Sequence, residues 1–274
     1  MAKFSGVLIC TDLDGTLFRN DKTVSEENLR AIEYFKSQGG YFAFVTGRMP
    51  SCAKDVYEIV KPNAPIGCIN GGGLYDFEKK DYIWAEKLPS EAISLVEEVD
   101  KKLPKVGIQP NAFYDIYFSR ENDVMEYFRT VTGVPNLVCD YHDVKDELAK
   151  VLFGTSEEDE MNSLIKLLNE HPLADRFTFI RSERTLYEIL PKGIGKGTAI
   201  SKLCEHLGVD KSKSVAIGDY YNDISMFNAA GVGIAVSNAC DEAKDAADFV
   251  TVSNEENAIA QVINDIENGK YIGD

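Results

Sequence analysis

The sequence predicts an α/β fold: a parallel sheet with helices on both faces, and an α+β segment inserted between its two halves. Two observations support this. At both ends of the chain, short apolar runs alternate with amphipathic helical segments, as parallel βαβ crossovers require. The middle of the chain lacks this alternation and places strands and helices in pairs. With 274 residues, the chain is long enough for two domains.

The N-terminal part predicts one strand–helix–strand unit. Residues 6–11 form an apolar run, which is typical of a strand buried on both faces. A helix is expected over residues 25–40, because Ser25 can cap its first turn and Gly39 can end it. Residues 41–48 then predict a second buried strand.

The C-terminal third repeats this rhythm and ends in an amphipathic helix. The expected helices are 196–208, 222–231 and 254–268, and the expected strands are 214–219, 232–236 and 247–252. Together with the N-terminal unit, these segments predict one alternating α/β domain.

The middle of the chain predicts a separate α+β insertion. The expected helices are 89–103, 120–133 and 157–171, and the expected strands are 112–119, 148–156, 176–182 and 185–191. The last two strands predict a hairpin. We therefore assign residues 1–82 and 189–274 to the α/β core and residues 83–188 to the insertion. The acids at 157–160 suit the first turn of a helix. Arg181 and Tyr187, in the hairpin, would either reach a substrate or be surface strand residues, and we favour the second interpretation.

The composition excludes several classes of partner. A net charge of −16 disfavours nucleic acid, because binding a phosphate backbone needs clustered Lys and Arg. Any phosphate site must therefore supply its own local positive charge. No apolar run reaches the ~20 residues of a membrane span, and the N-terminus does not fit a signal peptide. We expect a cytoplasmic protein with no membrane partner.

The cysteines and histidines do not form a recognisable metal or disulfide pattern. The six cysteines include no C-x-x-C pair, which argues against a zinc site and a disulfide framework and favours buried, reduced thiols. The three histidines lack the spacing of metal ligands.

Four polar clusters are candidates for chemistry: "DLDGT" (12–16), "TGR" (46–48), "KG" (196–197) and "GDYYND" (218–223). Three of them directly follow a predicted strand of the α/β domain, and ligands of such sheets bind beyond the carboxyl ends of the strands. These clusters would bring the following side chains to one crevice: Asp12, Asp14, Thr46, Asp219 and Asp223. Crowded carboxylates repel unless a cation shares the site, and their oxygen atoms suit Mg²⁺.

The first cluster can divide the chemistry between its two acids. Asp12, at the end of the strand, can be a nucleophile, and Asp14 can be the proton donor and acceptor. Gly15 allows a sharp turn, and the Thr16 hydroxyl can brace it. Nucleotide-binding alternatives fail on spacing, because "GIGKGT" and "GVGIAV" do not match a P-loop or a dinucleotide fingerprint.

These four clusters, in order, resemble the motifs of the haloacid dehalogenase (HAD) superfamily of phosphotransferases. Further segments resemble its Cof-type branch: "INGGGLYD" (69–76), "YEILPKGIGKG" (187–197) and "AVSNACDEAKDAADFVT" (235–251). The resemblance implies a Rossmann-like core and makes residues 83–188 a type IIB cap that sets substrate specificity. Most members of this branch are phosphatases of sugar phosphates and related compounds.

The resemblance also implies a role for each site residue. Asp12 would attack phosphorus to give an aspartyl-phosphate, and Asp14 would protonate the leaving oxygen and then activate water. Asp12, the backbone carbonyl of Asp14, and Asp219 would hold Mg²⁺, with Asp223 supporting the metal directly or through water. Thr46, Lys196 and Asn222 would bind the phosphoryl oxygens. The remaining expected phosphate or substrate contacts are Leu13, Gly47, Arg48 and Asn70; Arg48 and Asn70 would either contact the ligand or tie loops together.

We therefore expect a Mg²⁺-dependent phosphomonoester hydrolase acting on a small phosphorylated metabolite, with sugar phosphates as the leading class. Two alternatives use the same residues: a phosphosugar mutase and a non-catalytic sensor of a phosphate ligand. Tyr220 or Tyr221 would either edge the pocket or pack against the cap. The identity of the substrate and the oligomeric state stay open.

Overall fold

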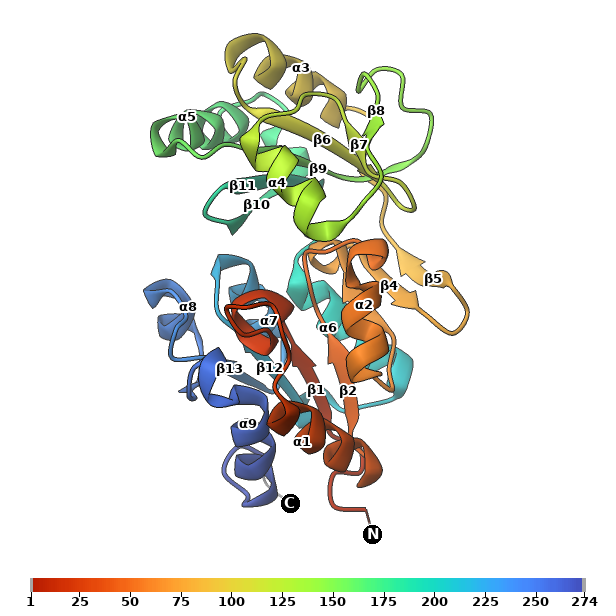
Figure 1. Cartoon of the computed structure of the whole chain (residues 1–274), viewed down its shortest axis with the longest axis vertical. Coiled ribbons are helices and arrows are strands. Elements are labelled where there is room, and N and C mark those ends of the chain that lie inside the picture. The colour runs from red at the N-terminus through yellow and green to blue at the C-terminus, as the bar shows by residue number, and fades with distance from the viewer. Residues whose placement is uncertain (1, 273–274) are drawn as a thin grey trace. The chain divides into compact units, whose positions relative to one another are not determined.

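The computed structural model describes residues 2–272, which form two compact units (Figure 1). Unit 1 comprises the described residues up to Gly47, then Lys54–Ala85, and the chain from Gly195 onward. Unit 2 comprises Arg48–Ala53 and Glu86–Ile194, so most of it is one continuous insertion into the sequence of unit 1.

Unit 1 is built on a parallel sheet with the strand order β14-β13-β12-β1-β2. The residues of β1 and β12 are buried throughout, as expected for strands that have helices on both sides. Because β1 lies between β12 and β2, the loops after these three strands are neighbours at one edge of the sheet. The strands are β1 (Leu8–Thr11), β2 (Tyr41–Phe44), β12 (Ser214–Gly218), β13 (Val232–Ala235) and β14 (Phe249–Val250).

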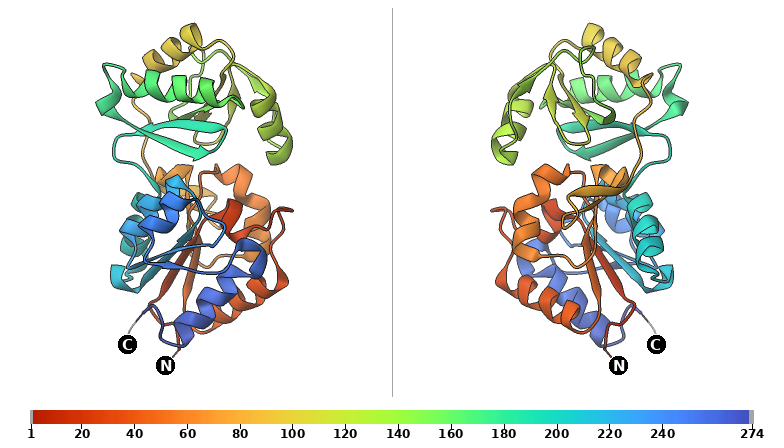
Figure 2. Two further views of the ribbon diagram at one scale, coloured as in Figure 1. Left: turned by 90° about the vertical axis from the view of Figure 1, so that its left-hand side faces the viewer. Right: turned by 90° about the vertical axis from the view of Figure 1, so that its right-hand side faces the viewer.

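Helices cover both faces of this sheet, which confirms the predicted α/β class. Helices α1 and α9 pack together on one face, and α6 and α7 pack together on the other (Figure 2). The helices of unit 1 are α1 (Glu26–Ser37), α6 (Lys196–Leu207), α7 (Ile224–Ala229), α8 (Asp241–Ala246) and α9 (Ala258–Glu267); α2 (Pro50–Val60) begins in unit 2 and continues in unit 1.

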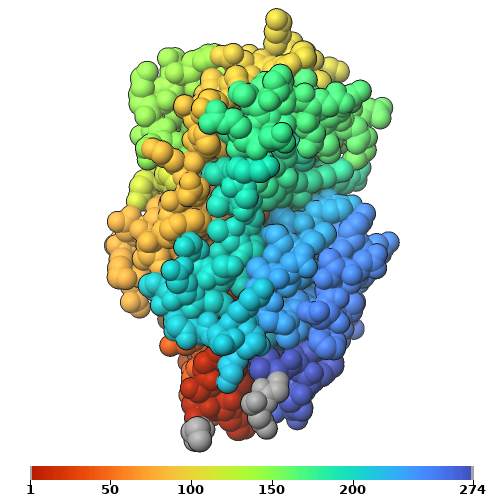
Figure 3. Space-filling view, turned by 180° about the vertical axis from the view of Figure 1, so that it is seen from behind, coloured from red at the N-terminus to blue at the C-terminus, as the bar shows by residue number. Residues whose placement is uncertain are grey.

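The predicted ends of two helices are confirmed. The Ser25 hydroxyl accepts a hydrogen bond from the backbone amide of Asn28 at 3.1 Å and caps α1. Gly208 adopts a left-handed conformation (φ 65°) and ends α6. The two ends of the chain also meet: Lys3 forms an ion pair with Glu267 of α9, and Figure 3 shows the N-terminal and C-terminal segments side by side.

A small antiparallel sheet extends unit 1 beyond β2. It consists of β3 (Ile66–Cys68), β4 (Gly73–Asp76) and β5 (Asp81–Ala85), and a parallel bridge between Val45 and Gly67 joins it to the end of β2. These strands were not predicted; β3 and β4 are short, and each contains a glycine. The turn between β3 and β4 brings Asn70 close to the loop that follows β2, since the backbone amide of Asn70 donates to the Thr46 carbonyl at 3.0 Å.

Unit 2 is an α+β unit with an antiparallel sheet in the order β10-β11-β9-β6. Helices α3 and α5 lie against one face of this sheet (Figure 2) and share its apolar core. The predicted hairpin of β10 and β11 is confirmed. The elements of unit 2 are α3 (Ala92–Lys102), α4 (Asp123–Thr132), α5 (Glu158–Asn169), β6 (Gly107–Ala112), β7 (Tyr117–Phe118), β8 (Leu137–Val138), β9 (Leu148–Gly154), β10 (Phe177–Glu183) and β11 (Leu186–Pro191).

Two expectations for unit 2 are wrong. The strand predicted over residues 112–119 is instead β6, ending at Ala112, followed by a turn and the short β7. The composition of β6, "GIQPNA", concealed it, because Gly, Pro and Asn are depleted in strands. Tyr187 is not exposed: it is 5% accessible, belongs to the apolar core, and accepts a hydrogen bond from Asn169.

The expected position of the acids at 157–160 is confirmed. The acids at 157–160 lie at the start of α5, and Glu158 forms a two-pronged ion pair with Arg181, with donor–acceptor distances of 3.0 and 2.8 Å. The six cysteines are free thiols; four are buried, and Cys139 and Cys240 are half-buried. None of the described helices is long and apolar enough to cross a bilayer.

The cap of α1 gives a test of the fold. Replacing Ser25 with Ala removes the hydroxyl that accepts from Asn28, so we expect Ser25→Ala to lower the free energy of unfolding by about 1 kcal/mol. Ser201→Ala, at an exposed position inside α6, is the matched control and should change it by less than about 0.5 kcal/mol. Urea denaturation followed by circular dichroism measures both; equal effects would show that the cap does not stabilise α1.

Candidate active site

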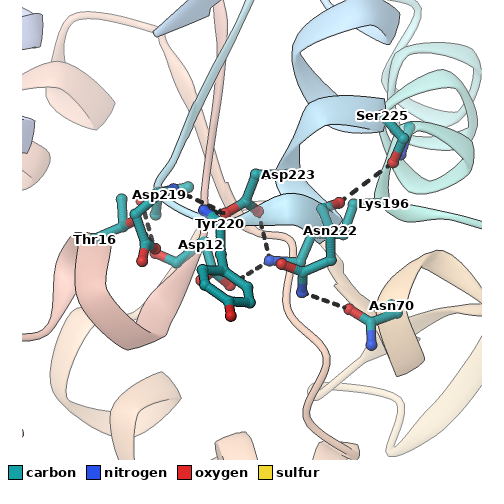
Figure 4. A network of polar contacts seen from close by, with 11 residues as sticks. Asp12, Thr16, Asn70, Lys196, Asp219, Tyr220, Asn222, Asp223 and Ser225 are labelled. Atoms are coloured by element: carbon teal, nitrogen blue, oxygen red, sulfur yellow. Dashed lines mark hydrogen bonds and ion pairs between the residues drawn. The ribbon is translucent and has the colours of Figure 1, made fainter. Parts of the chain in front are cut away.

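The candidate site lies at the carboxyl end of the parallel sheet of unit 1. Asp12 directly follows β1, Asp219 directly follows β12, and Lys196 is the first residue of α6. Figure 4 shows the side chains of Asp12, Lys196 and Asp223 gathered at one place. The predicted convergence of these clusters therefore comes from the order of the strands.

A buried lysine joins two of the acids. The Lys196 Nζ lies 2.7 Å from Oδ1 of Asp12 and 2.6 Å from Oδ1 of Asp223, and the lysine side chain is completely buried (Figure 4). Burial lowers the pKa of Lys196, but the two carboxylates outweigh this and raise its pKa above the usual value. The lysine is therefore charged, and it provides local positive charge in an acidic chain.

The carboxylates form a donor set suited to a divalent cation. Within the described residues, oxygen atoms of Asp12, Asp219 and Asp223 lie within 4.8 Å of one another. Burial, together with the neighbouring carboxylates, raises the pKa of Asp12 to about 7 and that of Asp219 to about 8, although Lys196 acts against both shifts. A divalent cation would balance three carboxylates beside one lysine and would favour their ionised forms. Because all the donors are oxygen atoms, the site fits a hard ion such as Mg²⁺.

Asp223 connects the parts of this site. Its Oδ1 accepts from Lys196, while its Oδ2 accepts from the backbone amides of Asp219 and Tyr220 at 2.8 and 3.0 Å. The side chain is completely buried. Asp223 therefore fixes the backbone that carries Asp219 and, at the same time, the position of the lysine.

The turn after Asp12 packs tightly against Asp219. The Thr16 hydroxyl donates to Asp219 Oδ1 at 2.8 Å, which ties the first and fourth motifs together. Gly15 has φ 80°, and a Cβ atom there would lie 2.4 Å from Asp219 Oδ2. Glycine at this position is thus required by both the backbone conformation and the close approach of the acid.

Asp14 does not place its carboxylate among the other acids. Its Oδ1 forms an ion pair with Lys22 at 2.8 Å, and both side chains are partly exposed. Leu13, between the two acids, is completely buried, and its carbonyl accepts from the Phe18 amide. The turn therefore holds Asp12 inside the cluster and directs the Asp14 carboxylate to Lys22.

Two asparagines brace this turn, and the sequence analysis did not single them out. Asn238 donates from Nδ2 to the Gly15 carbonyl at 2.8 Å, and its Oδ1 accepts from the backbone amide of Asn254 at 3.0 Å. Asn254 in turn donates from Nδ2 to the Phe18 carbonyl at 2.9 Å. The only signal in the sequence was that Asn238 falls within the segment 235–251, which carries part of the family resemblance.

A second polar group surrounds Asn70. Its Oδ1 accepts from Asn222 Nδ2 at 3.0 Å (Figure 4), and its side chain packs against Gly47. The Thr46 carbonyl accepts from the backbone amide of Asn70, and Thr46 is 1% accessible to solvent. Asn70 Nδ2 and Asn222 Oδ1 are buried and have no hydrogen-bond partner among residues 2–272. These atoms are suited to contact a bound ligand.

Arg48 belongs to unit 2, although it follows Thr46 and Gly47 directly in the chain. Its guanidinium donates to the Cys52 carbonyl at 3.1 Å, inside the first turn of α2. This contact fits the interpretation that Arg48 ties a loop, and a contact with a ligand stays a prediction. Tyr221 is partly exposed and donates its hydroxyl hydrogen to Glu242.

The close packing at Gly15 gives a test. We expect Gly15→Ala to lower the free energy of unfolding by at least about 1 kcal/mol more than Gly208→Ala does. Both glycines have positive φ, so both substitutions carry the same backbone penalty, but the space at Gly208 is open within 4 Å. Urea denaturation of the two variants isolates the clash with Asp219. Equal losses would contradict the packing described here.

The chain is similar in sequence to known proteins. A family model described as haloacid dehalogenase-like hydrolase matches residues 9–263. The 5-amino-6-(5-phospho-D-ribitylamino)uracil phosphatase YitU of Bacillus subtilis is 26% identical over 260 residues, covering 93% of this chain and 96% of that protein. The pyridoxal phosphate phosphatase YbhA of Escherichia coli is 28% identical over 270 residues, covering 93% and 97%.

The fold is also similar to that of a solved structure. The HAD subclass IIB sugar phosphatase BT4131 superimposes with a TM-score of 0.84 over 95% of this chain and 98% of that one; at 20% identity, this likeness shows the fold. The resemblance seen in the four motifs and the expected enzyme class, a HAD-type phosphatase, are both confirmed. The family match, which spans most of the chain, shows that this protein belongs to the haloacid dehalogenase-like hydrolases.

Proposed function

We propose that the chain is a Mg²⁺-dependent phosphomonoester hydrolase that works through an aspartyl-phosphate on Asp12. The observation that carries this proposal is the buried Lys196 between Asp12 and Asp223, with Asp219 in the same cluster. A fixed cation and a nucleophilic carboxylate at the edge of a parallel sheet are suited to stabilise a transferring phosphoryl group.

In the first step, a carboxylate oxygen of Asp12 forms a bond to phosphorus as the bond from phosphorus to the ester oxygen breaks. Protonated Asp14 gives its proton to the leaving oxygen, which departs as an alcohol. The Asp14 carboxyl group forms an ion pair with Lys22 in this structure, a contact that it would leave to act as the acid. Lys196 offsets the charge of the phosphoryl oxygens.

In the second step, water attacks the phosphorus of the aspartyl-phosphate, and the bond to Asp12 breaks. Asp14 takes a proton from that water, so inorganic phosphate is released and both acids return to their starting forms. The braces from Asn238 and Asn254 support this cycle, because they hold the turn from which both acids project.

The metal and the small ligand contacts complete the proposal. Asp12, Asp219 and the carbonyl of Asp14 would hold Mg²⁺, which would neutralise charge on the phosphoryl oxygens. Asp223 would support that site through its bonds to Lys196 and to the Asp219 amide. Thr46, Asn70 and Asn222 would donate to the phosphoryl group, and the orphaned Nδ2 of Asn70 supports this assignment.

The substrate is proposed to be a small phosphorylated metabolite, with sugar phosphates as the leading class. The two named relatives act, by their names, on a ribitylamino-uracil phosphate and on pyridoxal phosphate. They are phosphatases, so they favour hydrolysis over the mutase and sensor alternatives. Unit 2 is proposed to be the type IIB cap that selects the organic part of the substrate. The cytoplasmic location stays a prediction.

The nucleophile can be tested by a single substitution. Asp12→Asn removes the anionic oxygen that attacks phosphorus, so we expect turnover of p-nitrophenyl phosphate in Mg²⁺ buffer to fall by at least about 10³-fold. The circular dichroism spectrum should stay unchanged. Asp245→Asn, at an exposed position on α8, is the control and should keep wild-type activity. Activity retained in Asp12→Asn would refute the proposed nucleophile.

A further inference from the structure

Residues 19–23 form a tight loop directly after the turn of the first motif. The backbone amide of Arg19 donates to the Thr23 carbonyl at 2.9 Å, and the backbone amide of Lys22 donates to the Arg19 carbonyl at 2.9 Å. The Asp21 carboxylate accepts from the backbone amide and the hydroxyl of Thr23, at 2.9 and 2.6 Å. These bonds close the loop on itself, so its backbone has a defined shape.

The C-terminal part of unit 1 anchors this loop. The backbone amide of Asn20 donates to a carboxylate oxygen of Glu255 at 2.7 Å. Asn254, which is 2% accessible, donates from Nδ2 to the Phe18 carbonyl at 2.9 Å, just before the loop. The backbone that carries Lys22 is therefore held in place from a distant part of the sequence.

Lys22 is the ion-pair partner of Asp14. Its Nζ lies 2.8 Å from Oδ1 of Asp14, and the side chains of Lys22 and Asp14 are 51% and 26% accessible. Among the described residues, the carboxylate oxygens that lie within 4.8 Å of one another come from Asp12, Asp219 and Asp223. To reach an ester oxygen on the phosphorus that Asp12 attacks, the Asp14 carboxyl group must therefore leave Lys22.

The Asp14 side chain can change partners while its backbone stays in place. The Leu13 carbonyl before it accepts a backbone hydrogen bond, and the Gly15 carbonyl after it accepts from Asn238 at 2.8 Å. Because the backbone is held on both sides of Asp14, the change of partner needs only a rotation of its side chain. Lys22, on its own anchored loop, thus competes with a bound ester for the same carboxyl group.

We propose that Lys22 is a positioning residue for the proton carrier: it holds the Asp14 carboxyl group away from the ester oxygen until the side chain rotates toward a bound substrate. This inference rests on the proposed function, because it takes Asp14 to be the acid of the first step. Loss of the ion pair makes the Asp14 carboxyl group available more often. An ion pair between partly exposed groups shifts such an equilibrium by at most about five-fold, which sets the size of the effect.

The test compares three phosphate esters of similar size whose leaving oxygens differ in their need for a proton. The p-nitrophenyl oxygen leaves readily without one, the phenyl oxygen less readily, and the benzyl oxygen least readily. For Lys22→Met, we expect kcat/KM for benzyl phosphate, relative to that for p-nitrophenyl phosphate, to rise about two- to five-fold. Phenyl phosphate should lie between them. An effect of the lost charge on binding the phosphate group is common to all three esters and cancels in the ratio.

Three control variants assign the effect to the ion pair. Lys80→Met, in the turn between β4 and β5, should keep the wild-type ratio; Lys80 is an exposed lysine with positive φ (58°), as Lys22 is (64°). Lys22→Arg retains a cation that can pair with Asp14 and should also keep the wild-type ratio. In an Asp14→Asn background, Lys22→Met should leave the ratio unchanged, because there is no carboxylate to release.

The outcomes separate the inference from the proposed function. A ratio for Lys22→Met that equals the wild-type value or falls below it overturns the inference, and so does an equal rise in the Asp14→Asn background. If Asp14→Asn lowers kcat/KM for benzyl phosphate no more than for p-nitrophenyl phosphate, then Asp14 is not the acid, and the proposed first step fails together with the inference. If the wild-type protein hydrolyses none of the three esters in Mg²⁺ buffer, the proposed function itself fails.

Discussion

The site depends on the ion pairs that a buried lysine makes with two aspartates. Lys196 is inaccessible to solvent, so its charge is tolerable only because Asp12 and Asp223 accept from it. Removing one partner of such a buried pair typically costs about 3–5 kcal/mol. The three residues come from the end of β1, the start of α6 and the segment after β12. These ion pairs form only when the three elements lie close together, so the fold of unit 1 determines the geometry of the candidate site.

The same network explains why neighbouring carboxylates can behave differently. Asp12 and Asp219 are buried beside one another, which raises the pKa of each. Nearby positive charge would stabilise their ionised forms. Asp14, two residues from Asp12, is kept outside by a turn that Gly15 permits and that Asn238 holds in place. There, the Asp14 carboxyl group forms an ion pair with Lys22. One short turn thus separates the proposed nucleophile from the proposed proton carrier.

The predictable parts of this protein were those with periodic or clustered signals. Lys196 was predicted because it follows glycines and begins a clearly amphipathic helix, and Asp219 was predicted because it ends an apolar strand. Asn238 and Asn254 were not predicted, since single asparagines in loops have no pattern and their contacts are distant in sequence. The separate placement of the Asp14 carboxylate also depended on a contact, with Lys22, that composition does not reveal.

The missed strand carries a related lesson. β6 was not predicted because it contains Pro110 and two amide residues, Gln109 and Asn111, in place of apolar alternation. Both amides also have buried side-chain atoms without a hydrogen-bond partner among residues 2–272. Residues whose local preference conflicts with the fold are the hardest to place from sequence alone.

Diffraction from crystals grown with MnCl₂ would test the central claim directly, because Mn²⁺ can replace Mg²⁺ and gives an anomalous signal. The account predicts one strong anomalous peak within coordination distance of the Asp12 and Asp219 carboxylates, with Lys196 still bonded to Asp12 and Asp223. A cluster without a peak, or with its acids turned away from one another around a displaced lysine, would contradict it.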